Sequence, residues 1–243
     1  MNRPFSSSLS IALLVNVVLA LTVLLFSCSH PKNAENNNNV AAARSDSSGL
    51  DPGQTASVKI KSDTLKTTAL PATITYRGKP VKLMSWKDKL GENLLLLTET
   101  GEFASADSAE YEDNRDSELH VYHYVKTGEQ WNKMATVNDQ ISSCPVDIVT
   151  RFIPGALFIT DLNSDGIAEC TFAYHLTCTG GVDNKVMKLI MLEHKNKYVI
   201  RGTTSVNIGE EIPGTMKYKA GIPEHFKVFM IAKWKAFERE HYN

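Results

Sequence analysis

The sequence predicts a mainly β fold, made of antiparallel sheets of β-hairpins with one helix at the C-terminus. Short runs of alternating apolar and polar residues recur from about residue 58 onwards, separated by polar turns that contain glycine. Near the C-terminus, apolar side chains instead recur every three or four residues. The 26 Lys and Arg balance 27 Asp and Glu, and a net charge of −1 argues against a nucleic-acid partner.

Residues 1–27 have the features of a bacterial signal peptide. An apolar run of 16 residues, 11–26, follows Arg3, and it is short for a membrane span, which needs roughly 20 residues. Cys28 comes directly after Ser27, and this stretch resembles a bacterial lipoprotein signal, although a residue smaller than Phe26 is usual there. The resemblance implies that Cys28 becomes the lipid-bearing N-terminus and anchors the chain to a membrane. A plain secretory peptide or an uncleaved anchor are the alternatives.

Residues 28–57 are predicted to form a disordered tether. They contain four consecutive asparagines, 36–39, and a serine-rich stretch, but almost no large apolar residue that could offset the entropy of ordering. No acidic run follows Cys28 that would indicate export to the outer surface. We therefore expect a cell-envelope protein at the outer membrane, on its periplasmic side rather than at the cell surface.

Residues 58–243 are predicted to form a β-rich globular domain. Residues 72–76 and 81–86 alternate around residues 77–80, which predicts a hairpin there. Further strands are expected at residues 94–97, 119–125, 157–160, 167–176, 186–192 and 198–203.

Residues 119–137 and 187–204 share a faint common pattern of strand, polar turn, aromatic residue and strand. A degenerate repeat of propeller-like blades would produce such a pattern, and so would unrelated hairpins. Two units are too few to close a propeller.

The segment 161–169 carries the most informative motif, with Gly166 at its sixth position. Four side chains with oxygen atoms stand at positions 1, 3, 5 and 9 of this loop, and the carbonyl of Ile167 is a natural further ligand: Asp161, Asn163, Asp165 and Glu169. A hard cation such as Ca²⁺ takes six to eight oxygen ligands. Without a cation, clustered carboxylates repel one another and raise each other's pKa. The pattern predicts a structural calcium site.

The flanking sequence distinguishes this loop from an EF-hand. Position 12 is Phe172 instead of a bidentate glutamate, and the flanks are predicted strands. The loop resembles the single calcium loop of FG-GAP and VCBS-type β repeats, in which it joins two strands. A metal-free turn rich in Asp and Asn is the alternative, and Mg²⁺ fits the ligand set less well.

Three cysteines remain beside Cys28, and three single-bridge pairings are possible. Cys170 lies in the middle of a predicted strand and is expected to be a buried free thiol. The preferred disulfide is therefore Cys144–Cys178.

Residues 223–240 are predicted to form the C-terminal helix. Its apolar stripe contains Phe226, Met230 and Trp234, and Pro223 suits the first turn. Packing of this stripe on a sheet is the expected arrangement, and a helix lying on a membrane surface is the alternative.

The sequence contains no recognisable catalytic motif, so a non-enzymatic role is favoured without excluding catalysis. Residues 144–204, which include the calcium-like loop, resemble a family of bacterial envelope lipoproteins named surface polysaccharide biosynthesis proteins. The resemblance implies a binding or assembly factor linked to surface polysaccharide, with a glycan or an envelope protein as partner. An envelope hydrolase or transferase acting on glycans, or an inhibitor of secreted enzymes, are the alternatives.

Overall fold

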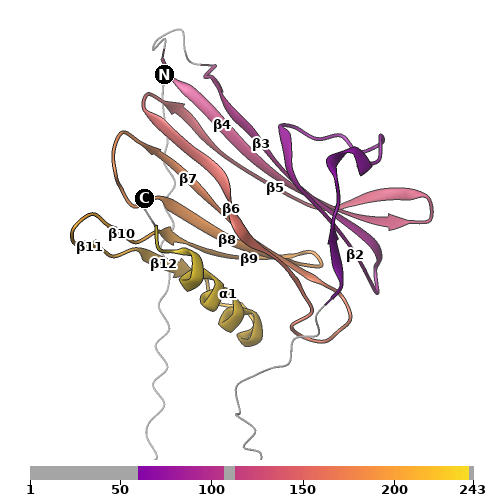
Figure 1. The fold of residues 1–243 in the computed structure, drawn as a ribbon. Coiled ribbons are helices and arrows are strands. Elements are labelled where there is room, and N and C mark those ends of the chain that lie inside the picture. The colour runs from indigo at the N-terminus through magenta and orange to yellow at the C-terminus, as the bar shows by residue number, and fades with distance from the viewer. Residues whose placement is uncertain (1–59, 107–112, 241–243) are drawn as a thin grey trace, which may run out of the picture. The chain divides into compact units, whose positions relative to one another are not determined.

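Two antiparallel sheets of five strands each and one C-terminal helix make up the fold (Figure 1). The computed structural model describes residues 60–106 and 113–240. All of them belong to one unit, Asp51–Asn243. The predicted signal peptide, Cys28 and the predicted tether lie outside the described residues. The prediction of a mainly β fold of antiparallel hairpins with a C-terminal helix is confirmed.

The first sheet has the strand order β1-β2-β3-β4-β5, so neighbours in space are also neighbours along the chain. A single 3-10 turn, η1 (Thr67–Ala69), follows its short edge strand. The strands of this sheet are β1 (Ser62–Thr64), β2 (Lys79–Asp88), β3 (Gly91–Ala104), β4 (Arg115–Thr127) and β5 (Gln130–Cys144).

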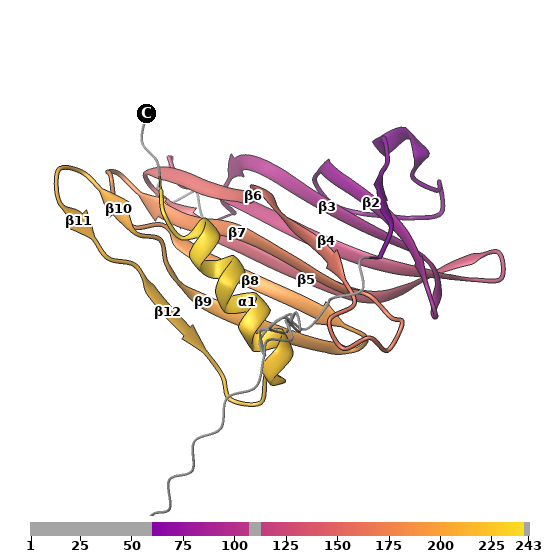
Figure 2. The ribbon, with the colours of Figure 1, turned by 60° about the horizontal axis from the view of Figure 1, so that its bottom comes forward.

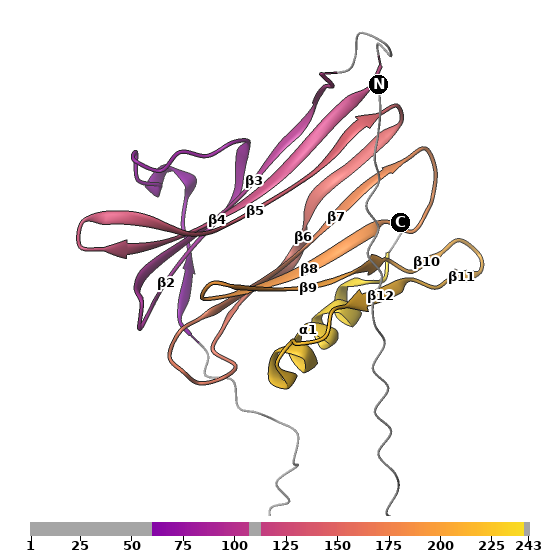
Figure 3. The ribbon, with the colours of Figure 1, turned by 180° about the vertical axis from the view of Figure 1, so that it is seen from behind.

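The second sheet has the strand order β12-β9-β8-β7-β6. A small two-stranded hairpin of β10 (Val206–Asn207) and β11 (Glu211–Ile212) lies in the chain between β9 and β12, as Figure 3 shows from behind. The strands of the second sheet are β6 (Asp147–Thr160), β7 (Glu169–Thr179), β8 (Val186–Glu193), β9 (Asn196–Thr203) and β12 (Thr215–Tyr218).

The two sheets pack face to face around a shared core. Leu95, Leu97 and Val121 from the first sheet contact the cluster that contains Phe172 and Tyr174 from the second. Strands β5 and β6 are joined by only Pro145 and Val146, so the chain passes from one sheet directly into the other. The disulfide Cys144–Cys178 lies at this crossing and links β5 to β7, with its Cα atoms 5.9 Å apart. The preferred pairing from the sequence is confirmed.

Each sheet is also covered on its outer face. Leu94 and Leu96 of β3 point away from the shared core and pack with Ile74 and Leu83 under the segment that precedes β2. This explains the unbroken apolar run 94–97, because a strand that is buried on both faces needs apolar residues at consecutive positions.

The outer face of the second sheet is covered by α1 (Glu224–Phe237), which lies across β8 and β9 in Figure 2. Its buried side chains, Phe226, Met230 and Trp234, pack against residues of the sheet such as Met191. The predicted C-terminal helix is confirmed, and its apolar stripe packs on the sheet. Within the described residues, no helix is long and apolar enough to cross a bilayer.

The predicted hairpin around residues 77–80 is wrong. Residues 72–76 form no strand, and Lys79 already begins β2, whose partner is β3 across the turn at Lys89 and Leu90. Gly78 has a φ of +84°, which redirects the chain from the covering segment into the sheet. Ile74 is buried on the outer face of the first sheet, so its alternating neighbours reflect a covering segment, not a paired strand.

The two stretches with a common sequence pattern correspond to the hairpins β4–β5 and β8–β9. Each is the second hairpin of a four-stranded meander, β2 to β5 or β6 to β9. The two meanders share one core between their faces, which is a sandwich arrangement and not the radial arrangement of propeller blades.

Candidate functional site

The loop of the predicted ion site joins β6 to β7. Asp161 is buried immediately after β6, and its Oδ2 atom accepts a hydrogen bond from the backbone N–H of Gly166 at 3.0 Å. Ser164 and Gly166 have positive φ values of 58° and 83°. The chain therefore turns sharply here and closes over the Asp161 carboxylate, and at Gly166 this conformation favours glycine.

Asn163 and Asp165 fold back on the backbone of the same loop. The Asn163 side-chain oxygen accepts from the N–H of Asp165 at 3.1 Å, and Asp165 Oδ1 accepts from the N–H of Ile167 at 2.8 Å. The Asn163 amide also donates to Asp165 Oδ2 at 2.9 Å. These bonds form successive Asx turns, which hold the loop compact.

Glu169 begins β7 and is fully buried. Its Oε2 atom accepts hydrogen bonds from the N–H of Leu162 and the hydroxyl of Thr160, both at 3.0 Å. Burial raises the pKa of Glu169 to about 7; the hydrogen bonds from Leu162 and Thr160 oppose that rise, and the nearby charge of Asp161 adds to it. Two acidic groups thus face a common buried region.

One oxygen of each of these two carboxylates lacks a partner. Asp161 Oδ1 and Glu169 Oε1 are buried and accept no hydrogen bond from the described residues. A buried carboxylate oxygen without a donor is costly, and a bound cation is one way to satisfy it. The chemistry of this pair fits the cation that the sequence predicts.

Asp165 lies on the more exposed side of the loop, where it meets a second group. One ligand atom each from Asp165, Glu193 and His194 lies within 4.8 Å of the other two. In the described part of the chain, no such group of three Asp, Glu, His or Cys side chains includes Asp161 or Glu169. The five predicted ligands therefore share one loop, but their carboxylates divide between a buried pair and an outer position.

The turn between β2 and β3 closes the loop from the other sheet, which the sequence did not indicate. Lys89 donates its backbone N–H to the carbonyl of Gly166 at 2.9 Å, and its ammonium group donates to the carbonyl of Asp165. Asp88 Oδ2 accepts from the N–H of Ala168 at 3.2 Å. No sequence signal marks these contacts, because Lys89 and Asp165 are 76 positions apart.

Cys170 follows Glu169 and is a free, fully buried thiol, as expected. Burial raises its pKa well above the usual value, and the charges of Asp88 and Glu169 act in the same direction. The thiolate is the reactive form of cysteine, so Cys170 has the character of a core residue and not of a nucleophile.

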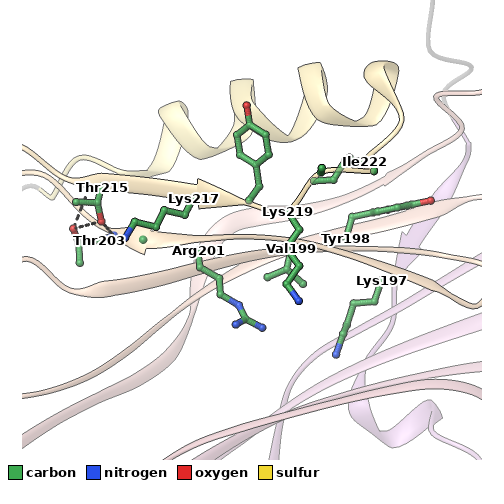
Figure 4. Close-up of a pocket in the computed structure, with 13 residues that line it drawn as sticks. Lys197, Tyr198, Val199, Arg201, Thr203, Thr215, Lys217, Lys219 and Ile222 are labelled. Atoms are coloured by element: carbon green, nitrogen blue, oxygen red, sulfur yellow. Dashed lines mark hydrogen bonds between the residues drawn. The ribbon is translucent and has the colours of Figure 1, made fainter. Parts of the chain in front are cut away.

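A second candidate site is a pocket of about 720 Å³ along β9 and β12 (Figure 4). It lies at one edge of the second sheet, and the ion loop joins the two strands at the opposite edge, β6 and β7. We call it the cationic groove, defined by its four basic lining residues, Lys197, Arg201, Lys217 and Lys219. All four are exposed, and no acidic residue lines the pocket. No local sequence pattern marks these residues, because they come together only when β9 pairs with β12.

Comparison with known proteins returns no relative: no family model, no curated protein and no solved structure matches the chain.

Proposed function

We propose that this chain is a lipid-anchored protein of the cell envelope and acts there as a binding or assembly factor linked to surface polysaccharide. The disulfide Cys144–Cys178 is the observation that carries the proposal, because stable disulfides belong to oxidising compartments outside the cytosol. The short apolar run that precedes Cys28 supports the same location and supplies the anchor.

The loop between β6 and β7 would hold a structural Ca²⁺ in this proposal. Asp161 and Glu169 would supply the buried carboxylate oxygens, with Asn163, Asp165 and the carbonyl of Ile167 as the remaining ligands. The two unpartnered oxygens support the assignment. A bound cation would also offset the repulsion between the two carboxylates and thereby strengthen the joint between β6 and β7.

Binding is favoured over catalysis by the composition of the cationic groove. Hydrolysis of glycans typically needs two carboxyl groups that flank the reacting bond, and this pocket is lined by none. Within the described residues, no specific observation favours a glycan-active enzyme or an inhibitor of secreted enzymes over a binding protein.

The anchor is tested by detergent-phase partition of the full chain and of Cys28→Ser, both expressed in a bacterium with an outer membrane. We expect the wild-type chain in the detergent phase and the variant in the aqueous phase. Equal partition of the two proteins would contradict the lipid anchor.

The link to polysaccharide is tested in a strain that lacks the gene. We expect this strain to carry less surface polysaccharide, with recovery on expression of the wild-type chain but not of Cys28→Ser. An unchanged amount of polysaccharide would refute a role in its assembly or retention.

A further inference from the structure

The cationic groove begins in a row of side chains that crosses four strands. Tyr174, Lys188, Arg201 and Lys217 are successive cross-strand neighbours on β7, β8, β9 and β12. Directly opposed residues of an antiparallel sheet point to the same face, so these four side chains share one face. Tyr174 belongs to the core between the two sheets, so this shared face is the inner face of the second sheet.

Only the first cation of this row is neutralised by a described residue. Lys188 pairs with Asp139 of β5, which also accepts a hydrogen bond from the Tyr174 hydroxyl at 2.9 Å. Arg201 and Lys217 take part in none of the described ion pairs. The compensation by the first sheet therefore stops at β8, and positive charge remains on β9 and β12.

The first sheet does not cover this part of the second. The shared core reaches Ile190 and Leu192 on β8 and includes Val199 of β9 as a partly buried member. Beyond that point, Lys197, Arg201 and Lys219 are exposed, and Figure 4 shows their side chains on the side of the sheet opposite to the helix. The inner face of β9 and β12 thus forms an open, basic margin of the sandwich.

Two glycines bring β9 and β12 unusually close at one end of the groove. A Cβ atom at Gly202 would overlap the carbonyl of Thr215, and one at Gly214 would overlap the carbonyl of Thr203. The hydroxyls of Thr203 and Thr215 lie 3.1 Å apart and add a polar wall (Figure 4). The backbone therefore fixes the spacing of the basic side chains on the two strands.

We propose that the cationic groove binds an acidic saccharide chain, one that carries phosphate or carboxylate groups at regular intervals. This inference rests on the proposed function, and it names the ligand class and its site. Lys197 and Arg201 on β9 are four residues apart, and Lys219, directly after β12, is two residues from Lys217 on that strand. An extended chain separates such cations by about 7–14 Å. Such spacing fits repeated charges along a chain better than one isolated anion.

The aromatic residues of the pocket argue against a single-stranded nucleic acid, which typically stacks its bases on exposed rings. Tyr198 packs its ring against Phe226 of the helix, with ring centroids 5.6 Å apart. Tyr218 is the cross-strand neighbour of Ile200, whose side chain lies in the core under the helix. Neither ring belongs to the basic face, whereas cations and hydroxyls are the groups that acidic sugars require.

The experiment measures binding of the full chain, held in detergent micelles, to immobilised polymers. Alginate supplies carboxylates, a sugar-phosphate polymer such as a teichoic acid supplies phosphates, and dextran is the neutral control. The test variant is Arg201→Gln, Lys217→Gln and Lys219→Gln combined. The matched control combines Lys66→Gln, Lys79→Gln and Lys235→Gln, which remove the same charge at exposed positions outside the groove.

We expect wild-type binding to at least one acidic polymer, weaker at high salt, and no binding to dextran. The groove variant should bind about tenfold more weakly or worse, and the control variant within about twofold of wild type. A thermal melt checks that both variants remain folded. Equal binding by the two variants, binding of dextran, or no binding to either acidic polymer would each overturn the proposal.

Failure of this inference and failure of the proposed function give different results. Polymer binding in solution does not depend on Cys28, so a groove that binds survives a negative partition experiment. Conversely, a chain that partitions into detergent and restores surface polysaccharide, yet binds no acidic polymer, would keep its function and lose this ligand.

Discussion

At the scale of single residues, Asp161 and Glu169 give the ion loop its chemical character. Both are buried, both make hydrogen bonds through one oxygen, and each leaves its second oxygen without a partner in the described structure. The loop also presents a competing outer group, formed by Asp165, Glu193 and His194. Two substitutions of the same chemical kind can distinguish these two positions for a cation.

We predict that Glu169→Gln abolishes stabilisation by calcium and that Glu193→Gln retains it. At a calcium concentration ten times the dissociation constant, binding should add about 1.4 kcal/mol to the free energy of unfolding. Urea unfolding of each protein with calcium and with chelator measures this increment. Loss of the calcium effect in Glu193→Gln alone would move the ion to the outer group, and no effect in the wild type would remove the ion.

The oxygen spacing of residues 161–169 was sufficient to locate the turn, because Asp, Asn and Gly impose turn geometry locally. It did not show that Asp161 and Glu169 are the buried acids of the loop. It was not sufficient to assign the direction of each side chain. Asp165 is held by the N–H of Ile167 and approaches His194, and Lys89 reaches the loop from another sheet. Such contacts depend on packing between distant segments, which local spacing does not encode.

His123 provides a prediction of pH dependence at the same scale. It is buried against Trp86, with ring centroids 5.3 Å apart, and its Nε2–H donates to Asn93 at 2.9 Å, which leaves Nδ1 without a partner among the described residues. Burial lowers the pKa of His123 from 6.5 to about 4, and the charge of Asp88 opposes this shift. The folded protein therefore resists protonation of this ring.

The unfolded chain binds a proton at His123 below about pH 6.5, whereas the folded chain stays neutral there until about pH 4. Stability should therefore fall as the pH falls through this window, by on the order of 2 kcal/mol at pH 4.5 from this residue. We predict that His123→Gln loses this part of the pH dependence, as measured by urea unfolding at pH 7 and pH 4.5. Identical pH profiles of the two proteins would contradict the assignment.

At the scale of elements, the hairpins were predictable where alternation and turn residues coincide. The β4–β5 turn at Gly128 and Glu129 is such a case, and helix α1 follows from the spacing of Phe226, Met230 and Trp234. Prediction failed at residues 72–76, because a segment lying over a sheet and a strand within it can both alternate in polarity. Only burial of Ile74 against another part of the chain distinguishes them.

Glycine at position 202 makes the pairing of β9 with β12 possible, since a Cβ at Gly202 would overlap the backbone of Thr215. We predict that Gly202→Ala lowers the free energy of unfolding by about 1–3 kcal/mol, because the strands must separate. The matched control is Gly181→Ala, where an added Cβ has its nearest contact at 4.0 Å and a change within about 0.5 kcal/mol is expected. Equal effects in urea unfolding would contradict this close approach.

At the scale of the whole molecule, the fold is a stack in which each layer depends on the next. The shared core holds the two sheets together, and the covering segment and α1 close the outer faces. Such a stack leaves the sheets' edges as the accessible places for function. The ion loop lies where β6 turns into β7 against the β2–β3 turn, and the cationic groove lies at the uncovered β9–β12 edge.

The covalent tie between the sheets is Cys144–Cys178, which spans a sequence separation of 34 residues. In the chain-entropy model, a disulfide closing a loop of this length contributes about 3–4 kcal/mol by restricting the unfolded chain. We predict a loss of this size in Cys144→Ala combined with Cys178→Ala, measured by urea unfolding without reductant. The control is Cys170→Ala, which keeps the disulfide, so added reductant should lower its stability by as much as it lowers that of the wild type. Added reductant should bring the wild type down to the level of the double variant, because both then lack the tie between β5 and β7. A wild type that is equally stable with and without reductant, while thiol titration shows that the bond has been cleaved, would mean that noncovalent packing alone holds the two sheets together.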